Sequence, residues 1–448
     1  MTRRISAHLA ASPILRHSKY VLLELAIAYV ISNINQMVIN RFSAAAVAAQ
    51  GSAAQVATFV LNLYTLLSVG ASILLMRYAD DAHKDDCQRV CTVSVLDVLV
   101  VGVGLSAAGY ALCPLILRLM QIPQALYPHA YSYLAVMLGF SFVGGLLTLV
   151  SAIYRAYGAM RVMLVVDTGI NLLCMALNIL VLYVVPPEKQ SLGLYAANGV
   201  IAQAIGCVLL LRFLHKTTGW KFLFRLAPSH ALRQIHIDTG RILRYGVMGG
   251  AEGLIYLAGQ TVVVAIVGLL GEREMLVRAY VLNITPYLML CDTAITTAAF
   301  YVVGKRAGAG DPDGARAACR QSVGHAIIAT AVVGGVFLLL AEPILRLYTQ
   351  DAAILLDCKR LLCICTLSEI LRCPASLFVS SLKAVGRVDA PFAVILPGMA
   401  LNVACSWICG IWLGWGLIGI WVGYMLDHLF RGVTLGIVWQ RWTPDVAH

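Results

Sequence analysis

Long apolar segments constrain the fold of this chain more than any other feature. About twelve segments of roughly 18 residues or more carry few charges, and each is long enough as a helix to cross the roughly 30 Å hydrocarbon core of a bilayer. The segments are residues 20–40, 53–76, 92–113, 130–153, 162–185, 193–214, 242–269, 276–303, 322–341, 355–381, 391–413 and 415–438. Membrane-spanning strands would need only about ten residues and would alternate in polarity. The sequence therefore predicts an all-α membrane protein.

The charge content supports this prediction. Charged residues make up 12% of the chain, against about 25% in a typical soluble domain. The net charge of +11 comes from Lys and Arg residues on alternate loops and near both termini, with Arg155 and Lys383 among them. Cytoplasmic loops retain such residues. We therefore expect an integral protein of the cell inner (plasma) membrane, in contact with membrane lipids, with both termini cytoplasmic and no nucleic-acid partner.

Internal repetition divides the chain into two halves. The stretch "KDDCQRVCTVSV" (84–95) resembles "PDGARAACRQSV" (312–323), and "YRAYG" (154–158) resembles "LKAVG" (382–386). The offset between matches is about 221 to 228 residues, a period typical of duplicated architectures. Six crossings return a chain to its starting side, so the halves have the same orientation. Parallel repeats of this kind are a transporter architecture with a central site between two lobes.

These observations predict two pseudo-symmetric six-helix lobes joined by a polar, basic linker. The predicted parts are a cytoplasmic N-terminal arm (1–19), an N-terminal lobe (20–214), a cytoplasmic interlobe linker (215–240), a C-terminal lobe (241–440) and a cytoplasmic tail (441–448). The 13 cysteines have no metal-ligand spacing, and most fall in apolar segments where cysteine is a small apolar residue. We therefore expect no metal, no cofactor and no enzymatic activity.

Several motifs occur together in the order found in one transporter family. They are "NRFSAAAVAAQG", "GASILLMRYADDAHKDDCQRV", "YRAYGAMR", "VVGKRAGAGDPDGARAA" and "LKAVGRVDAP". With them the chain resembles the MATE (multidrug and toxic compound extrusion) family of the MOP flippase superfamily over nearly its whole length. The resemblance implies a monomeric antiporter that exports small amphipathic, often cationic, organic compounds in exchange for protons or sodium.

The first lobe differs from many members of that family at two positions. Relatives often carry an aspartate on the first helix, where this chain has Asn35, and another on the fifth helix, four residues after Asn178, where it has Leu182. A neutral amide does not change its protonation near pH 7. Asn35 and Asn178 either line a cavity as hydrogen-bonding groups or join helices as buried amides.

The second lobe keeps acidic residues within its apolar segments. Glu252, Tyr256 and Gln260 are spaced by four residues on one helical stripe, and Asp292 is predicted to lie at about the same depth on the next helix. Ionisable residues inside a membrane are costly unless they are paired or face a wet cavity. Glu252 and Asp292 are therefore candidates for a proton or cation site, with a structural carboxylate as the alternative.

Other intramembrane charges have close partners in the sequence. Asp427 can pair with Arg431 one turn later, and Glu369 lies close enough to Arg372 to pair. Asp97 and Asp167 fall near the cytoplasmic starts of their helices, where caps or pairs with loop arginines are expected. These acids are weaker candidates for the central site than Glu252.

The hypothesis that follows is antiport centred on Glu252. Its carboxylate attracts a cationic substrate to a cavity without lysine, and a proton or sodium ion then neutralises it. Since the matching region of the first helix has only Asn35, ion coupling is expected to reside in the C-terminal half. Two alternatives remain: a flippase for a lipid-linked or polar cargo, and a non-transporting receptor or channel.

Overall fold

The computed structural model describes residues 13–77, 84–120, 122–124, 126–218 and 230–443. Within these ranges the regular elements are all helices, as predicted. The long ones are α2 (Pro13–Phe42), α3 (Ala44–Arg77), α4 (Lys84–Leu119), α5 (Tyr127–Gly139), α6 (Ser141–Ala156), α7 (Met160–Val184), α8 (Leu192–Thr218), α9 (His230–Leu270), α10 (Glu272–Gly308), α11 (Pro312–Leu339), α13 (Ala352–Ala384), α14 (Asp389–Trp407) and α15 (Gly416–Gln440). Each predicted apolar segment corresponds to one helix or to two consecutive helices, because a backbone in lipid must satisfy its own hydrogen bonds.

Most of these helices are long enough to span a membrane. Ten described helices are long and apolar enough to cross a membrane, or up to eleven if the bent pair α5 and α6 counts as one span. Helix α15 has 25 residues but is not among them. Its middle contains Asp427, His428 and Arg431, which lower its mean hydropathy. The described part of the chain therefore confirms an all-α membrane protein.

The chain forms two compact units. One is Leu23–Gly250, and the other combines Met1–Leu22 with Ala251–His448. Helices α2 and α9 therefore each contribute residues to both units. Of the predicted arm, linker and tail, residues 1–12, 219–229 and 444–448 lie outside the described residues. The described part of the linker is helical, because α8 ends at Thr218 and α9 begins at His230.

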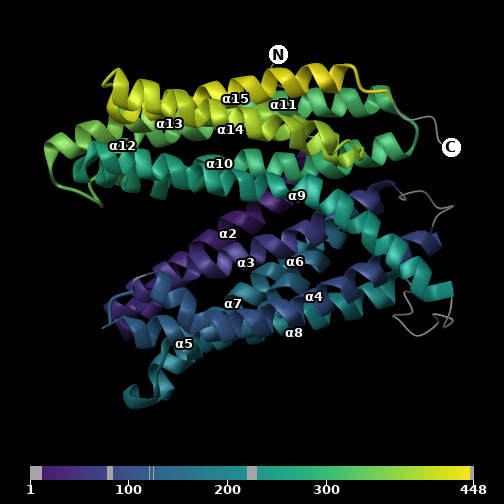
Figure 1. Cartoon of the computed structure of the whole chain (residues 1–448), viewed down its shortest axis with the longest axis horizontal. Coiled ribbons are helices and arrows are strands. Elements are labelled where there is room, and N and C mark those ends of the chain that lie inside the picture. Colours follow the sequence, from purple (N-terminus) through teal and green to yellow (C-terminus); the bar gives the residue numbers. More distant parts are fainter. Residues whose placement is uncertain (1–12, 78–83, 121, 125, 219–229, 444–448) are drawn as a thin grey trace. The chain divides into compact units, whose positions relative to one another are not determined.

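The unit Leu23–Gly250 is a bundle in which α3 packs against α4, α5 and α6 (Figure 1). The segment predicted as one helix is bent by 51° between α5 and α6. The amide of Phe142, just after the bend, donates to Ser106 Oγ at 3.2 Å, so the polar side chain satisfies a freed backbone group. A Cβ at Gly145 would overlap the Tyr64 ring, so glycine is needed there.

The start of α9 is fixed to the same bundle. A Cβ at Gly70 or Gly246 would overlap the backbone of the facing helix, so α3 and α9 approach closely through two glycines. Asp238 Oδ2 accepts from Arg89 Nε at 2.6 Å, and Thr239 donates to Asp97 at 2.8 Å. The expectation that Asp97 caps its helix or pairs with a loop arginine is wrong, because α4 begins at Lys84, well before Asp97, and the side chain instead accepts from Thr239.

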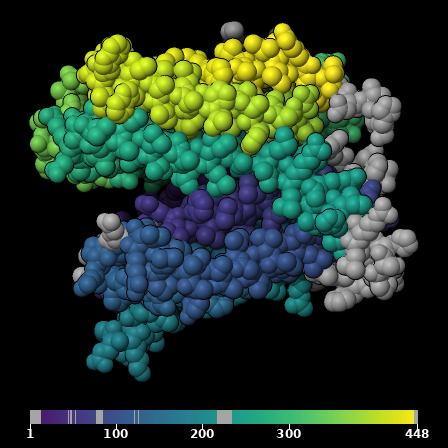
Figure 2. All heavy atoms as spheres, viewed as in Figure 1, coloured from purple at the N-terminus to yellow at the C-terminus, as the bar shows by residue number. Residues whose placement is uncertain are grey.

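In the second unit, α13 packs against α10, α11 and α15 (Figure 1). Buried Ala298, Leu377 and Leu435 belong to its core. Figure 2 shows α13, α14 and α15, from green to yellow, as one continuous layer of side chains on the face in view. Large apolar side chains such as Leu339 and Val433 are 85% and 61% exposed. An apolar outer surface of this kind suits contact with lipid chains.

Candidate functional site

A buried cluster on α10 and α13 contains Asp292. Asp292 is 1% exposed, and its Oδ1 accepts from Ser376 Oγ at 2.9 Å. Arg372 Nη2 lies 2.9 Å from Asp292 Oδ2, and Arg372 Nε lies 2.7 Å from Glu369 Oε2. The predicted proximity of Glu369 and Arg372 is therefore present in the structure, and Asp292 joins them from the neighbouring helix.

The charges of this cluster do not balance. Two carboxylates, Asp292 and Glu369, contact one guanidinium group, that of Arg372. Each unpaired ion in a low-dielectric interior costs several kcal/mol. Binding of one proton or one monovalent cation would neutralise the excess charge. We call Asp292, Glu369, Arg372 and Ser376 the α13 acidic centre.

A second buried pair, on α15, is charge-balanced. Arg431 Nη2 contacts Asp427 Oδ2 in a short ion pair, as the spacing of four residues predicted. Asp427 is 0% exposed and Arg431 is 8% exposed. A Cβ at Gly398 on α14 would overlap Asp427 Oδ1, so this pair is packed tightly against the next helix. These features indicate a structural role for Asp427.

The stripe of Glu252, Tyr256 and Gln260 on α9 does not form one cluster. Gln260 Oε1 accepts from Tyr424 OH of α15 at 2.6 Å. Tyr256 is 39% exposed. Glu252 has a different partner, since its Oε2 lies 2.6 Å from Lys383 Nζ on α13. The expectation that Glu252 faces a region without lysine is therefore wrong.

Glu252 and Asp292 have different partners on α13. Lys383 lies in the last turn of α13 and follows Ser376, the partner of Asp292, by seven residues. Seven residues correspond to roughly 10 Å along a helix. Glu252 and Asp292 thus contact side chains whose Cα positions on α13 are about two turns apart, and their equal depth in the membrane stays a prediction. From the sequence, Lys383 was assigned to a cytoplasmic loop. Its contact with Glu252 was missed because a long lysine side chain at a helix end can reach back along its helix.

In the first unit, the two predicted asparagines contact one another. Asn178 is 1% exposed; it donates to Asn35 Oδ1 at 2.7 Å and accepts from Asn198 Nδ2 at 2.8 Å. The three amides connect α2, α7 and α8. Asn198 was not predicted, although an asparagine within an apolar segment was the available signal. The contact fits helix joining by buried amides.

In the first unit Arg155 contacts two acids: Asp167, for which an arginine partner was expected, and Glu24, which was not predicted. Arg155 Nη2 lies 2.5 Å from Glu24 Oε1 and 3.8 Å from Asp167 Oδ2. Glu24 precedes Glu252 by 228 residues, and Arg155 precedes Lys383 by the same number. The statement that the first helix has only Asn35 as a counterpart is therefore wrong. The match of "YRAYG" with "LKAVG" already aligned Arg155 with Lys383, and the same offset identifies Glu24.

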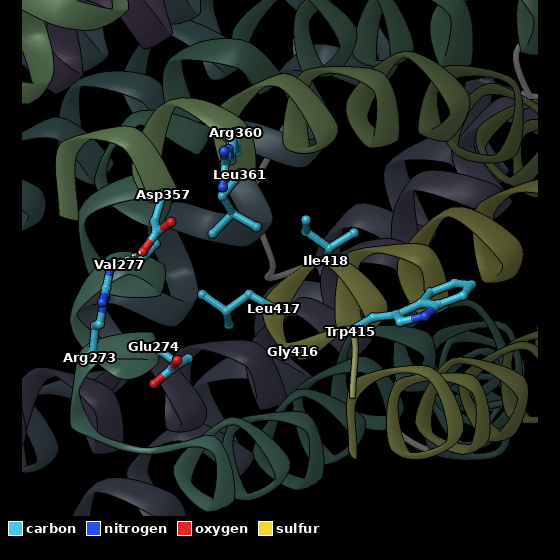
Figure 3. Close-up of a pocket in the computed structure, with 10 residues that line it drawn as sticks. All are labelled: Arg273, Glu274, Val277, Asp357, Arg360, Leu361, Trp415, Gly416, Leu417 and Ile418. Carbon is cyan, nitrogen blue, oxygen red and sulfur yellow. Dashed lines mark hydrogen bonds and ion pairs between the residues drawn. The ribbon is translucent and has the colours of Figure 1, made fainter. Parts of the chain in front are cut away.

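A surface pocket lies elsewhere in the second unit, near the starts of α10, α13 and α15 (Figure 3). Its lining residues are Arg273, Glu274, Val277, Asp357, Arg360, Leu361, Trp415, Gly416, Leu417 and Ile418. Arg273 Nη2 lies 2.5 Å from Asp357 Oδ2. None of the predicted site residues lines this pocket. The α13 acidic centre lies in the second half of α13, away from it.

Comparison with known proteins identifies the family. The family model described as MatE matches residues 21–184 and 250–408. The chain belongs to the MatE family. It is thus a membrane transporter, and the resemblance drawn from its motifs is confirmed.

Relatives in this family agree in length and fold. The uncharacterised transporter YisQ of Bacillus subtilis is 24% identical over 429 residues, covering 95% of this chain and 92% of the relative. The probable multidrug resistance protein NorM of Thermotoga maritima is 21% identical over 396 residues, covering 88% and 84%. A solved MOP superfamily transporter from Pyrococcus furiosus has a TM-score of 0.85 at 17% identity, with 96% of each chain covered. An outward-facing multidrug resistance MATE transporter also has a TM-score of 0.85, at 18% identity and 96% coverage of each chain. These structures show the same fold.

Proposed function

We propose that this MatE protein is a secondary antiporter that exports small amphipathic, cationic organic compounds in exchange for protons or sodium. It would act by alternating access as a monomer in the cell inner membrane, with both termini cytoplasmic. The observation that carries the proposal is the α13 acidic centre, in which two buried carboxylates contact one arginine. Multidrug resistance proteins among the relatives support the substrate class.

The chemistry of the centre suits exchange of cations. With Asp292 and Glu369 ionised, one negative charge remains beyond that of Arg372, and it attracts a cationic substrate or a coupling ion. Neutralisation of that charge by a proton or sodium weakens the attraction for the substrate. The single hydroxyl proton of Ser376 is within reach of both Asp292 oxygens, at 2.9 and 3.1 Å, and of the Cys373 backbone oxygen at 3.0 Å. Donation to Asp292 would orient its carboxylate.

In this proposal, Glu252 binds a substrate or a proton only after its partner Lys383 is displaced. Its carboxylate is already neutralised by Lys383 Nζ at 2.6 Å. A cationic substrate or a proton therefore binds there only when it replaces the ammonium group. Tyr256 and Gln260 follow Glu252 along α9 and offer hydroxyl and amide contacts to such a substrate. Asn35 is proposed as an uncharged contact of the first lobe, and buried Asn178 as the amide that holds it in place by donating to its Oδ1 at 2.7 Å.

Proteoliposomes under separately imposed proton and sodium gradients test this function. We expect wild-type export of a cationic dye to follow one of the two gradients. Export by the Asp292→Asn variant should be at least about tenfold slower, because removing one carboxylate leaves the centre with no excess negative charge. The control is Glu342→Gln, which alters an exposed ion pair outside the spans. Gradient-driven export that is unchanged in Asp292→Asn would refute the role of the centre.

A further inference from the structure

A second acid-rich cluster lies in the first unit, at Glu24. Glu24 is 5% exposed although it lies on α2, much of whose surface is exposed. Arg155 Nη2 contacts Glu24 Oε1 at 2.5 Å and lies 3.8 Å from Asp167 Oδ2. Two carboxylates from α2 and α7 thus share one nitrogen of one guanidinium group. As in the α13 acidic centre, one negative charge is in excess.

An unsatisfied oxygen indicates what the cluster holds. Glu24 Oε2 is buried and has no hydrogen-bond partner among the described residues, although buried carboxylate oxygens ordinarily accept a hydrogen bond. Arg155 Nε is likewise buried without an acceptor, so the guanidinium does not bind Glu24 through two nitrogens. Asp167 Oδ2 lies 3.8 Å from the same Arg155 Nη2 that Glu24 Oε1 contacts at 2.5 Å, so the two carboxyl groups are neighbours. An O–H group on Asp167 is therefore the available donor.

We infer that Glu24 and Asp167 hold one proton between them, next to Arg155, as a protonation site of the first unit. The shared proton removes the repulsion between two carboxylates and supplies the missing donor. The groups that face the site are Arg155 of α6 and the Cys207 thiol of α8, which lies near Asp167. A thiol is ordinarily neutral near pH 7, so Arg155 supplies the only positive charge among these groups.

This site is distinct from the chain of amides in the same unit. Asn35 follows Glu24 by eleven residues on α2, and Asn178 follows Asp167 by eleven residues on α7. Eleven residues correspond to roughly 16 Å along a helix. The protonation site therefore lies about three turns away from the amides, on the same two helices.

The second repeat provides a matched control. Its pair, Glu252 with Lys383, occupies the equivalent positions, but the residue 228 after Asp167 is Ile395. With one carboxylate and one ammonium group the pair is balanced. No shared proton is expected there.

Infrared difference spectroscopy of the purified protein, stepped from alkaline to acid pH, tests this inference. We expect the wild type to show a carboxylic C=O component that is absent from both Asp167→Asn and Glu24→Gln and retained in Glu252→Gln, whereas any band of the α13 acidic centre is common to all four proteins. In Glu24→Gln the band is lost because Asp167 then pairs alone with Arg155 and ionises. Carboxylic bands that are identical in the wild type and in both variants would overturn the proposal.

A replacement variant and a measurement that needs no transport allow the experiment to decide the question. If either variant aggregates on size exclusion, Asp167→Glu, which keeps a carboxyl group beside Arg155, takes its place. That variant is expected to retain the band at a shifted frequency, and an unshifted band overturns the proposal. The use of this proton in transport rests on the proposed function, but the measurement needs neither substrate nor gradient. A transporter driven by sodium alone would still show the band.

Discussion

The two repeats place an ion pair at the same position and surround it differently. Glu24 pairs with Arg155 in the first unit and Glu252 with Lys383 in the second, in each case from the first helix of the repeat. Asp167 adds a second acid to the first pair, whereas Ile395 stands at the equivalent position of the second. The difference suggests a rule that we propose for this protein: charge balance, and not membrane depth alone, decides which carboxylate is free to bind a proton or an ion.

The same rule separates two groups within the second unit. The pair of Asp427 with Arg431 is balanced, and the α13 acidic centre carries an excess acid. Among the described residues, each unit therefore contains an acid-rich cluster that is its own candidate for ion binding. The idea that coupling resides only in the C-terminal half depended on a missing counterpart of Glu252. Glu24 is that counterpart.

The largest effect is expected where a balanced pair is broken. Arg431→Met leaves Asp427, which is 0% exposed, without its cation, and should reduce the free energy of unfolding by about 3 to 5 kcal/mol. The double variant Asp427→Asn with Arg431→Met should recover most of that loss. Equilibrium unfolding in mixed micelles measures both. A loss below about 1 kcal/mol, as at surface pairs, would show that the pair is not structural.

A smaller effect is expected at the donor that orients Asp292. Ser376→Ala removes the hydroxyl donor that lies 2.9 and 3.1 Å from the two Asp292 oxygens and should weaken binding of the coupling ion by about 0.5 to 1.5 kcal/mol, or roughly two- to tenfold. The dependence of export on ion concentration measures this affinity. Ser380→Ala is the control, because that hydroxyl donates to the backbone oxygen of Thr296 at 3.2 Å. Equal shifts in both variants would argue against a specific role for Ser376.

The fold was predictable because its signals are local. Apolar segments such as 276–303 identify a helix from composition alone, and the ordered motifs identify the family. The bend at Phe140 was not predicted, because it depends on contacts of its neighbours with Ser106 and Tyr64 from other helices. Sequence periodicity contains no information on such contacts.

The site was predicted only in part for the same reason. Asp292 and the spacing of Glu369 and Arg372 were identified within their helices, but their convergence depends on how α10 packs against α13. Lys383 was assigned to a loop because it follows an apolar segment. The sequence does not show that its long side chain reaches back to Glu252. Glu24 was not predicted because it lies in none of the short motifs that the two repeats share. Its match with Glu252 appears only when the 228-residue offset is applied to residues outside those motifs.

A reciprocal exchange of charge balance between the repeats tests the central claim most directly. Asp167→Ile gives the first unit the composition of the second, and Lys383→Met leaves Glu252 with no cation at 2.6 Å. Infrared titration should show a carboxylic C=O band lost in Asp167→Ile and a new band gained in Lys383→Met, because an unpaired, partly buried carboxylate takes up a proton more readily. Unchanged bands in both variants would contradict the claim that charge balance determines where this transporter binds protons.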